Sequence, residues 1–342
     1  MAYNANQHLI KFHNDRVFVN EAALEQARSR RQANRNRLER GLQKNNEPVP
    51  VNYVHQGSYA MGTMTQSDVD TSDIDDGVIF TRDSLKTPNG RDRTPSEIKN
   101  MVCNALSAGD VFNTPPEVRT NCVRIYYNDG FHVDMPIYRT FEEDGVAQKE
   151  LAAAGTWTKS SPEEITSWFV EQVNKKSPDT TNGRQMRRIV RLIKYWAKSR
   201  ASWNMPSGFI ISILVDEALG FGILDRDDQV LLTVIRSIHT RLLDNTNVYR
   251  PVSPHENLSK ASSVSKLSAM KETLASVIEE LSKTERSDCN ELMAIKALKT
   301  IFYTDYWDSR ISDLESDAEK NQRIYAEPKK PIDKQGGTGQ YA

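Results

Sequence analysis

The spacing of apolar and polar residues changes along the chain, and it first predicts a long helix. Residues 21–44 are rich in Ala, Leu, Glu, Gln and Arg, which are good helix formers. Leu38 and Leu42 fall near one face, and arginines cover most of the remainder. Pro48 ends this pattern, because proline cannot continue a helix.

A strand-rich stretch follows the long helix. Residues 51–54 and 74–80 have the short apolar pattern of extended chain. Residues 123–127 and 131–138 alternate on either side of Asn128-Asp129-Gly130, a turn that is typical of a hairpin. These segments predict a sheet in the first half of the chain.

Helix start signals then become frequent. Thr94-Pro95-Ser96-Glu97 begins a helix that we expect to reach about Ala108, and Ser161-Pro162-Glu163-Glu164 begins another, because each places a hydroxyl cap before Pro and Glu. Further helices are predicted at residues 183–202, 207–219, 226–243, 262–281 and 287–302.

The order of these elements predicts an α+β fold in two halves. We expect a mixed strand and helix region with the long helix at residues 1–155, and a helical region at 156–322. Residues 323–342 are rich in Gly, Pro and Lys without apolar periodicity, which predicts a flexible tail. A cleft between the two halves is the natural place for a site.

Composition narrows the class of protein. Hydrophobic residues make up 38% of the 342, enough for a sizeable core, and the net charge of −1 gives no general affinity for nucleic acid or membranes. The three cysteines lie far apart outside any C-x-x-C pair, which indicates reduced thiols rather than disulfides or zinc. Without a signal peptide pattern or a long apolar run, we expect a cytoplasmic protein with no membrane contact.

A pair of carboxylates two residues apart carries the strongest chemical signal. Asp73 and Asp75 would project from one face of a strand, about 7 Å apart, and repel each other unless a cation lies between them. Asp134 lies in the apolar stretch 131–135, where a carboxylate is costly to bury unless it is paired or binds metal. Mg²⁺ is the expected cation, with Mn²⁺ as a substitute, because both prefer oxygen ligands. Three carboxylates can hold two metals, one activating a hydroxyl and one clamping a triphosphate.

Neighbouring aspartates have other interpretations. Asp68-Val69-Asp70 repeats the spacing but lies among Thr, Gln and Ser, which is typical of a loop. Asp76 points to the face opposite Asp75, and we expect it to be a turn or capping residue.

Gly57 and Ser58 provide a second element of a site. A Gly before a Ser at the start of a helix lets the backbone approach a phosphate, which N–H groups and the hydroxyl then bind. Sixteen positions separate Gly57 from Asp73, and the combination predicts a nucleotide phosphate site.

A basic stripe provides a third element. Arg187, Arg191, Lys194 and Lys198 are spaced four, three and four residues apart, so they share one face of a helix. No acidic residue is interspersed, which favours an anionic partner such as a triphosphate. Ser207, at the start of the next helix, is a further phosphate-binding candidate.

Together these motifs resemble the polymerase-β-like nucleotidyltransferases that include poly(A) polymerases and oligoadenylate synthases. Gln-Gly-Ser at 56–58, Asp-Ile-Asp-Asp-Gly at 73–77 and His-Val-Asp-Met-Pro at 132–136 are most similar to the bacterial relatives of cGAS, the CD-NTases, and among these to the DncV-like ones. The resemblance extends over about residues 50–260 and includes Ile-Lys-Tyr-Trp-Ala-Lys at 193–198 and Pro-Ser-Gly at 206–208.

The resemblance implies a two-lobed fold with the site in the cleft and the long N-terminal helix as a spine linking both lobes. It implies a Mg²⁺-dependent nucleotidyltransferase that joins ATP and/or GTP into a cyclic di- or trinucleotide, which signals to a separate effector in antiphage (CBASS) defence. The catalytic metal ligands would be Asp73, Asp75 and Asp134, and the nucleotide-binding residues Gln56, Gly57, Ser58, Lys194, Lys198 and Ser207.

Two expectations concern other partners. cGAS carries a zinc-binding Cys/His cluster for DNA, and this sequence has nothing like it, so we expect no direct DNA-binding zinc module. In some related systems a ubiquitin-transfer-like enzyme conjugates the synthase through its C-terminus. The Gly-rich ending motivates the hypothesis of a conjugation partner here, and conjugation that survived truncation after Pro331 would contradict it.

Two other functions stay open. A transferase on the same scaffold would add nucleotides to RNA or to a small molecule, although the net charge of −1 and the absence of an RNA-binding motif count against RNA. A non-catalytic nucleotide-binding protein is the other, and the presence of all three carboxylates counts against it. The bases joined, the ring size and the linkage are not encoded in these motifs, because they depend on how the acceptor ribose is placed.

Overall fold

The computed structural model describes residues 3–66, 73–108, 114–177, 179, 184–220 and 225–326. Within these residues, eight strands form one sheet. They are β1 Asn52–Gln56, β2 Asp73–Thr81, β3 Glu117–Val118, β4 Val123–Tyr126, β5 His132–Met135, β6 Ile137–Glu143, β7 Val146–Ala153 and β8 Thr156–Lys159. Their order is β3-β4-β5-β2-β6-β7-β8, with β1 paired to β2 outside this path. The sheet is mixed, because β2 runs parallel to β5 and β6 and antiparallel to β1.

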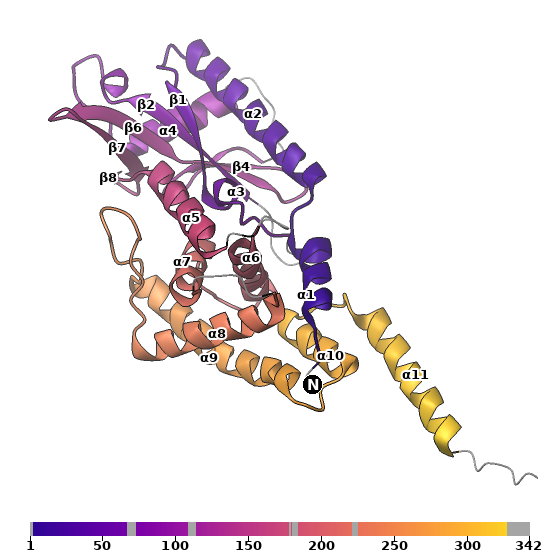
Figure 1. The fold of residues 1–342 in the computed structure, drawn as a ribbon. Coiled ribbons are helices and arrows are strands. Elements are labelled where there is room, and N and C mark those ends of the chain that lie inside the picture. Colours follow the sequence, from indigo (N-terminus) through magenta and orange to yellow (C-terminus); the bar gives the residue numbers. More distant parts are fainter. Residues whose placement is uncertain are drawn as a thin grey trace, which may run out of the picture.

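Two helices, α2 (Glu21–Lys44) and α4 (Pro95–Ser107), pack on each other and against this sheet (Figure 1). Helix α4 begins with a capping box in which Thr94 and Glu97 satisfy each other's backbone N–H groups. Gly41 allows the close approach of the two helices, since a Cβ there would lie 1.9 Å from the carbonyl oxygen of Ala105. The apolar faces of both helices and the inner face of the sheet form one hydrophobic core.

The remaining helices form a second lobe with its own hydrophobic core. They are α1 Asn6–Phe12, α5 Pro162–Lys176, α6 Gln185–Lys198, α7 Gly208–Ala218, α8 Asp227–Asp244, α9 Ala261–Ser282, α10 Glu291–Phe302 and α11 Asp308–Ala326, with short helical turns at His13–Val17 and Lys283–Glu285. A third short turn, Asp83–Leu85, follows β2 in the sheet lobe. Phe12 of α1 packs its ring against Tyr195 of α6 and Phe302 of α10, so the N-terminus belongs to the helical core.

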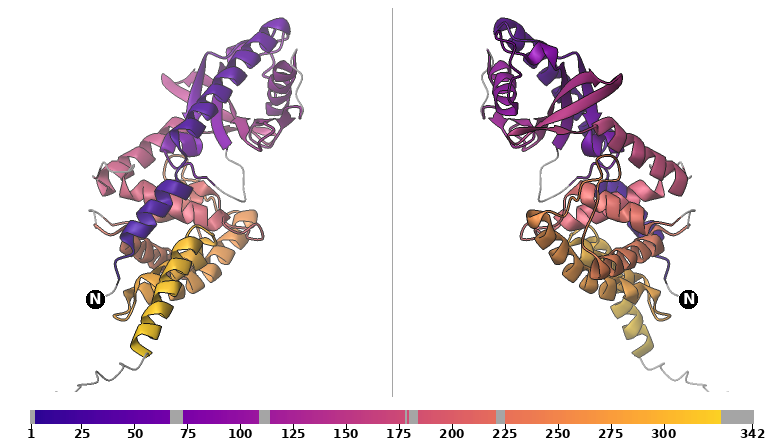
Figure 2. Two further views of the ribbon diagram at one scale, coloured as in Figure 1. Left: turned by 90° about the vertical axis from the view of Figure 1, so that its right-hand side faces the viewer. Right: turned by 90° about the vertical axis from the view of Figure 1, so that its left-hand side faces the viewer.

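The sheet lobe and the helical lobe meet where α5 contacts β1 and α6, beside the short helix α3 (Gly57–Met61) (Figure 2). Helix α1 lies in the helical lobe and α2 lies along the sheet lobe (Figure 1). The N-terminal region therefore links both lobes through two successive helices rather than through α2 alone.

The α+β fold, the helix at 21–44 and the hairpin at Asn128-Asp129-Gly130 are confirmed. Strands β7 and β8 were not predicted from the sequence. Helix α11 was also not predicted, and it continues to Ala326, past the end at residue 322 that the sequence suggests for the helical region. The rest of the proposed tail, 327–342, lies outside the described residues. The division of the chain at residue 155 stays a prediction.

None of the described helices is both long and apolar enough to cross a membrane.

Candidate nucleotide-binding site

A cavity of about 450 Å³ lies between the two lobes. The sheet lobe contributes Asp73 and Asp75 of β2, and the helical lobe contributes Lys194 and Lys198 of α6. The end of β1 and the start of α3 contribute three further lining residues, Gln56, Gly57 and Ser58. The structure thus brings eight of the nine sequence-predicted residues to this cavity or to a neighbouring one; Asp134 is the exception.

The carboxylates of Asp73 and Asp75 lie two residues apart on β2. Burial raises the pKa of Asp75 to about 7, and the negative charges of Asp73 and Asp134 add to this effect. Within the described residues, no ion pair involves Asp73 or Asp75. Two crowded carboxylates without a cation form a donor set that fits a hard divalent ion.

The third carboxylate, Asp134, is on β5 directly beside Asp75 in the parallel pairing of β2 and β5. Both of its oxygens accept hydrogen bonds from Arg124 of β4, from Nε at 2.7 Å and from Nη2 at 2.7 Å. In the part of the chain that the structure describes, no group of three or more His, Cys, Asp or Glu side chains is close enough to hold a metal ion. Asp134 neighbours the pair through the sheet, but its carboxylate is engaged by a guanidinium in this conformation.

Gly57 is held tightly against the carboxylate pair. Its φ of +63° lies in the left-handed region, and a Cβ at this position would lie 1.9 Å from Oδ2 of Asp75. The adjacent Gln56 accepts a hydrogen bond from the hydroxyl of Tyr138, at 2.9 Å, so its side chain is fixed to β6. The Gly at this position is required for the close approach of α3 to β2.

The basic residues of α6 make contacts with the backbone that the sequence does not predict. Three of its cations, Arg187, Arg191 and Lys194, donate to consecutive backbone carbonyls at 61–63. The bonds are Arg187 Nε to Met61 O at 3.0 Å, Arg191 Nε to Gly62 O at 3.1 Å and Lys194 Nζ to Thr63 O at 2.7 Å. Carbonyls at the end of a helix lack partners within it and favour nearby cations, so these side chains fasten the end of α3 to the helical lobe.

Lys194 also faces the carboxylates. Burial lowers the pKa of its ammonium to about 8, with Lys198 adding to the effect, whereas Asp73 and Asp75 raise it. A cavity of about 420 Å³ adjoins the first one, since Lys194, Lys198 and Gly208 line both. Ser207 lines this second cavity and caps α7, because its hydroxyl accepts a hydrogen bond from the N–H of Ile210 at 3.4 Å.

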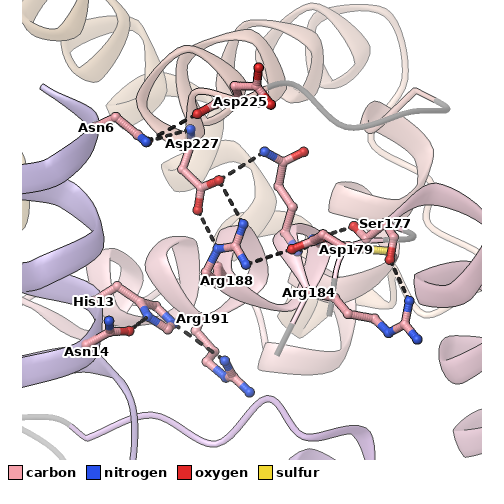
Figure 3. Close-up of polar contacts among 12 residues, drawn as sticks. Asn6, His13, Asn14, Ser177, Asp179, Arg184, Arg188, Arg191, Asp225 and Asp227 are labelled. Atoms are coloured by element: carbon pink, nitrogen blue, oxygen red, sulfur yellow. Dashed lines mark hydrogen bonds and ion pairs between the residues drawn. The ribbon is translucent and has the colours of Figure 1, made fainter. Parts of the chain in front are cut away.

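Helix α6 is anchored in the helical lobe by buried polar contacts (Figure 3). Arg188 donates to both carboxylate oxygens of Asp227 at the start of α8, from Nε at 2.6 Å and from Nη2 at 3.0 Å. A third nitrogen of Arg188 bonds Asp179 at 3.0 Å, and Asn6 of α1 accepts from the N–H of Asp227 at 2.7 Å. One face of α6 is thus fixed to its own lobe while another holds α3.

Asp76 is neither a turn nor a capping residue, which corrects the sequence interpretation. It is fully buried in β2 and bonds Arg35 of α2, whose Nε lies 2.7 Å from Oδ2. The competing pair Asp68 and Asp70 lies outside the described residues. Sequence reasoning also missed Arg250, which lines the main cavity from the loop between α8 and α9. A single arginine in a loop carries no motif that marks it.

Comparison with known proteins agrees with this architecture. Residues 51–138 match the family described as cyclic GMP-AMP synthase DncV-like, nucleotidyltransferase domain. Among solved structures, Vibrio cholerae DncV bound to the linear intermediate 5′ pppA(3′,5′)pG aligns with a TM-score of 0.68 at 14% identity, over 88% of this chain and 96% of that one. CdnG of Bradyrhizobium diazoefficiens in complex with GTP aligns with a TM-score of 0.61 at 17% identity, over 84% and 95%.

A third similar structure is CdnC of E. coli MS115-1 with ATP, at a TM-score of 0.62 and 15% identity, over 87% of this chain and 98% of that one. At such identities the structural likeness concerns the fold, whereas the sequence match concerns the sheet region that carries the carboxylates. Together they show that residues 51–138 match a DncV-like nucleotidyltransferase domain and that the chain shares its fold with these solved structures.

Proposed function

We propose that this protein joins ATP and/or GTP into a cyclic di- or trinucleotide that signals to a separate effector in antiphage (CBASS) defence, in the cytoplasm. The observation that carries the proposal is the convergence of Asp73 and Asp75 with Ser58 and Lys194 on one cavity between the lobes. The similar DncV structure contains a linear pppApG intermediate, which supports a dinucleotide-forming reaction in this fold.

We assign Asp73, Asp75 and Asp134 to two Mg²⁺ ions, which would lower the pKa of the attacking hydroxyl and neutralise the triphosphate. Ser58, at the start of α3, and Lys194 would hold the phosphates, with Lys198, Ser207 and the backbone at Gln56 and Gly57 as further contacts. Lys194 suits this role because its ammonium lines the cavity beside both carboxylates, and we expect it to exchange its backbone carbonyl for a phosphate when nucleotide binds.

The test is incubation of the purified protein with all four labelled nucleoside triphosphates and Mg²⁺ or Mn²⁺, followed by phosphatase treatment and mass spectrometry. We expect a phosphatase-resistant cyclic product, absent from Asp73→Asn/Asp75→Asn. The matched control is Asp83→Asn, which removes an exposed carboxylate that pairs with Lys86, and it should leave the product unchanged.

Two outcomes would contradict the proposal. Extension of an added RNA or small-molecule acceptor, without a cyclic product, would assign the chain to a transferase of another kind. Absence of nucleotide binding, measured by calorimetry with Mg²⁺, would remove the basis of the proposal altogether.

A further inference from the structure

Arg250 is a buried cation without a counter-charge in the described part of the chain. The residue is 6% exposed, and its Nε and Nη2 have no hydrogen-bond partner within that part. The acid on the same loop, Glu256, pairs with Lys260 at 3.5 Å. Burying an unpaired charge is costly, so a protein tends to retain one only where a ligand or partner supplies the missing contact.

The loop holds Arg250 in a defined position. Its backbone N–H bonds Glu256 O at 2.9 Å, and its neighbour Tyr249 forms a β-bridge with Asn257. This loop reaches from α8 and α9 towards the sheet lobe (Figure 1). The side chain lines the same cavity as Asp73, Ser58 and Lys194.

The two atoms without a partner lie on one edge of the guanidinium. That edge presents two parallel N–H groups, which suit a ligand with two adjacent acceptor atoms. Elsewhere in the chain the same edge binds both oxygens of a carboxylate. The pairs are Arg35 with Asp76, Arg124 with Asp134, Arg188 with Asp227, Arg226 with Asp228 and Arg286 with Asp288.

We propose that Arg250 is a substrate-binding residue whose Nε and Nη2 take two adjacent acceptors of the bound nucleoside triphosphate. Phosphate oxygens provide such a pair, and so do O6 and N7 of guanine. The inference rests on the proposed function, because it places the ligand in the same cavity, and it adds a contact from the helical lobe that faces the carboxylates of the sheet lobe.

The experiment compares the wild type with Arg250→Met and Arg250→Lys by calorimetry in Mg²⁺. The ligands are inorganic tripolyphosphate and the α,β-methylene analogues of ATP and GTP, which exclude turnover. We expect Arg250→Met to weaken binding about tenfold to a hundredfold, since hydrogen bonds to a charged group are lost. The affinity of Arg250→Lys should lie between those of the wild type and Arg250→Met. Lysine keeps the positive charge but lacks the two parallel N–H groups of the guanidinium.

A thermal melt without ligand separates binding from a structural role. Arg250→Met removes a buried uncompensated charge, so its Tm should equal or exceed that of the wild type. The matched control, Arg226→Met, breaks a paired guanidinium outside the cavity, so it should lower the Tm and leave nucleotide affinity unchanged.

The outcomes distinguish the sources of the ligand. Weaker binding of all three ligands would assign Arg250 to phosphate, and weaker binding of the GTP analogue alone would assign it to the guanine edge. Unchanged affinity for every ligand, or a lowered Tm as the only effect, would overturn the inference. A wild type that binds none of them would instead overturn the proposed function, and the inference with it.

Discussion

Arg124 donates a hydrogen bond to each carboxylate oxygen of Asp134, from Nε at 2.7 Å and from Nη2 at 2.7 Å. The two residues are direct partners across β4 and β5, and Asp134 is in turn the partner of Asp75 across β5 and β2. The guanidinium therefore occupies one lone pair on each oxygen and places a positive charge beside the carboxylate. We therefore expect Arg124 and a divalent cation to compete for the carboxylate of Asp134.

Arg124→Gln should therefore strengthen Mn²⁺ binding in the absence of nucleotide by about tenfold, the equivalent of one charge-assisted contact. The measurement is Mn²⁺ titration followed by electron paramagnetic resonance at pH 8.5. This pH is chosen because the pKa of Asp75 is about 7, and loss of the nearby guanidinium raises it further. Arg119→Gln, which removes an exposed guanidinium that pairs with Glu117 two residues before it, is the control. Equal or weaker Mn²⁺ binding in Arg124→Gln would show that the two cations do not compete.

Gly57→Ala should lower the Mn²⁺ affinity of the site more than it lowers the stability of the fold. The new Cβ meets Oδ2 of Asp75 at 1.9 Å, so the carboxylate must move, and we expect Mn²⁺ affinity to fall at least about tenfold. The left-handed φ of +63° adds about 1 kcal/mol of backbone strain. Gly145→Ala isolates that strain, because Gly145 has a φ of +74° and open space around its Cβ position. If both variants lose the same stability and neither loses Mn²⁺ affinity, the contact with Asp75 has no role.

The sequence predicted elements wherever a local signal is strong. The caps at Thr94 and Ser161 and the turn at residues 128–130 begin or join the elements that were expected from them. Strand β7 was missed because it is mostly half-exposed on both faces, so its residues do not alternate between apolar and polar. Helix α1 has only seven residues, too few to establish a period.

Parts of the site depend on contacts that no linear pattern contains. Asp76 meets Arg35 across 41 positions of the chain, so the spacing around Asp75 gives no hint of that ion pair. The basic residues lie on one face of α6, as the sequence predicted. The sequence shows no acidic partners for them, and in the structure Arg187 and Arg191 donate to backbone carbonyls instead. A carbonyl belongs to every residue, so sequence alone cannot identify it as a partner.

Arg191→Met should loosen α3 without unfolding either lobe. Its guanidinium donates to Gly62 O and lies over the ring of Phe18, 4.7 Å from the centroid. Loss of a charged donor at this helix end should raise hydrogen exchange of amides 58–65 about tenfold or more, measured by mass spectrometry on the full chain. Arg241→Met is the control, since Arg241 also donates to backbone carbonyls after a helix, at Asn247 with 2.6 Å, but outside the cleft. Increased exchange over the whole helical lobe would instead mean that Arg191 supports the core in general.

His13 should make the stability of the protein sensitive to acid. The residue is 1% exposed, its ring lies beside Arg191 (Figure 3), and burial lowers its pKa from 6.5 to about 4. Between these two pH values the unfolded chain binds a proton that the folded chain does not, so stability falls as pH decreases from 6.5 towards 4. The slope from this residue is at most about 1.4 kcal/mol per pH unit. Denaturant unfolding of His13→Gln should show a shallower loss of stability than the wild type in this window, and parallel curves would mean that His13 is protonated in the folded state as easily as in the unfolded one.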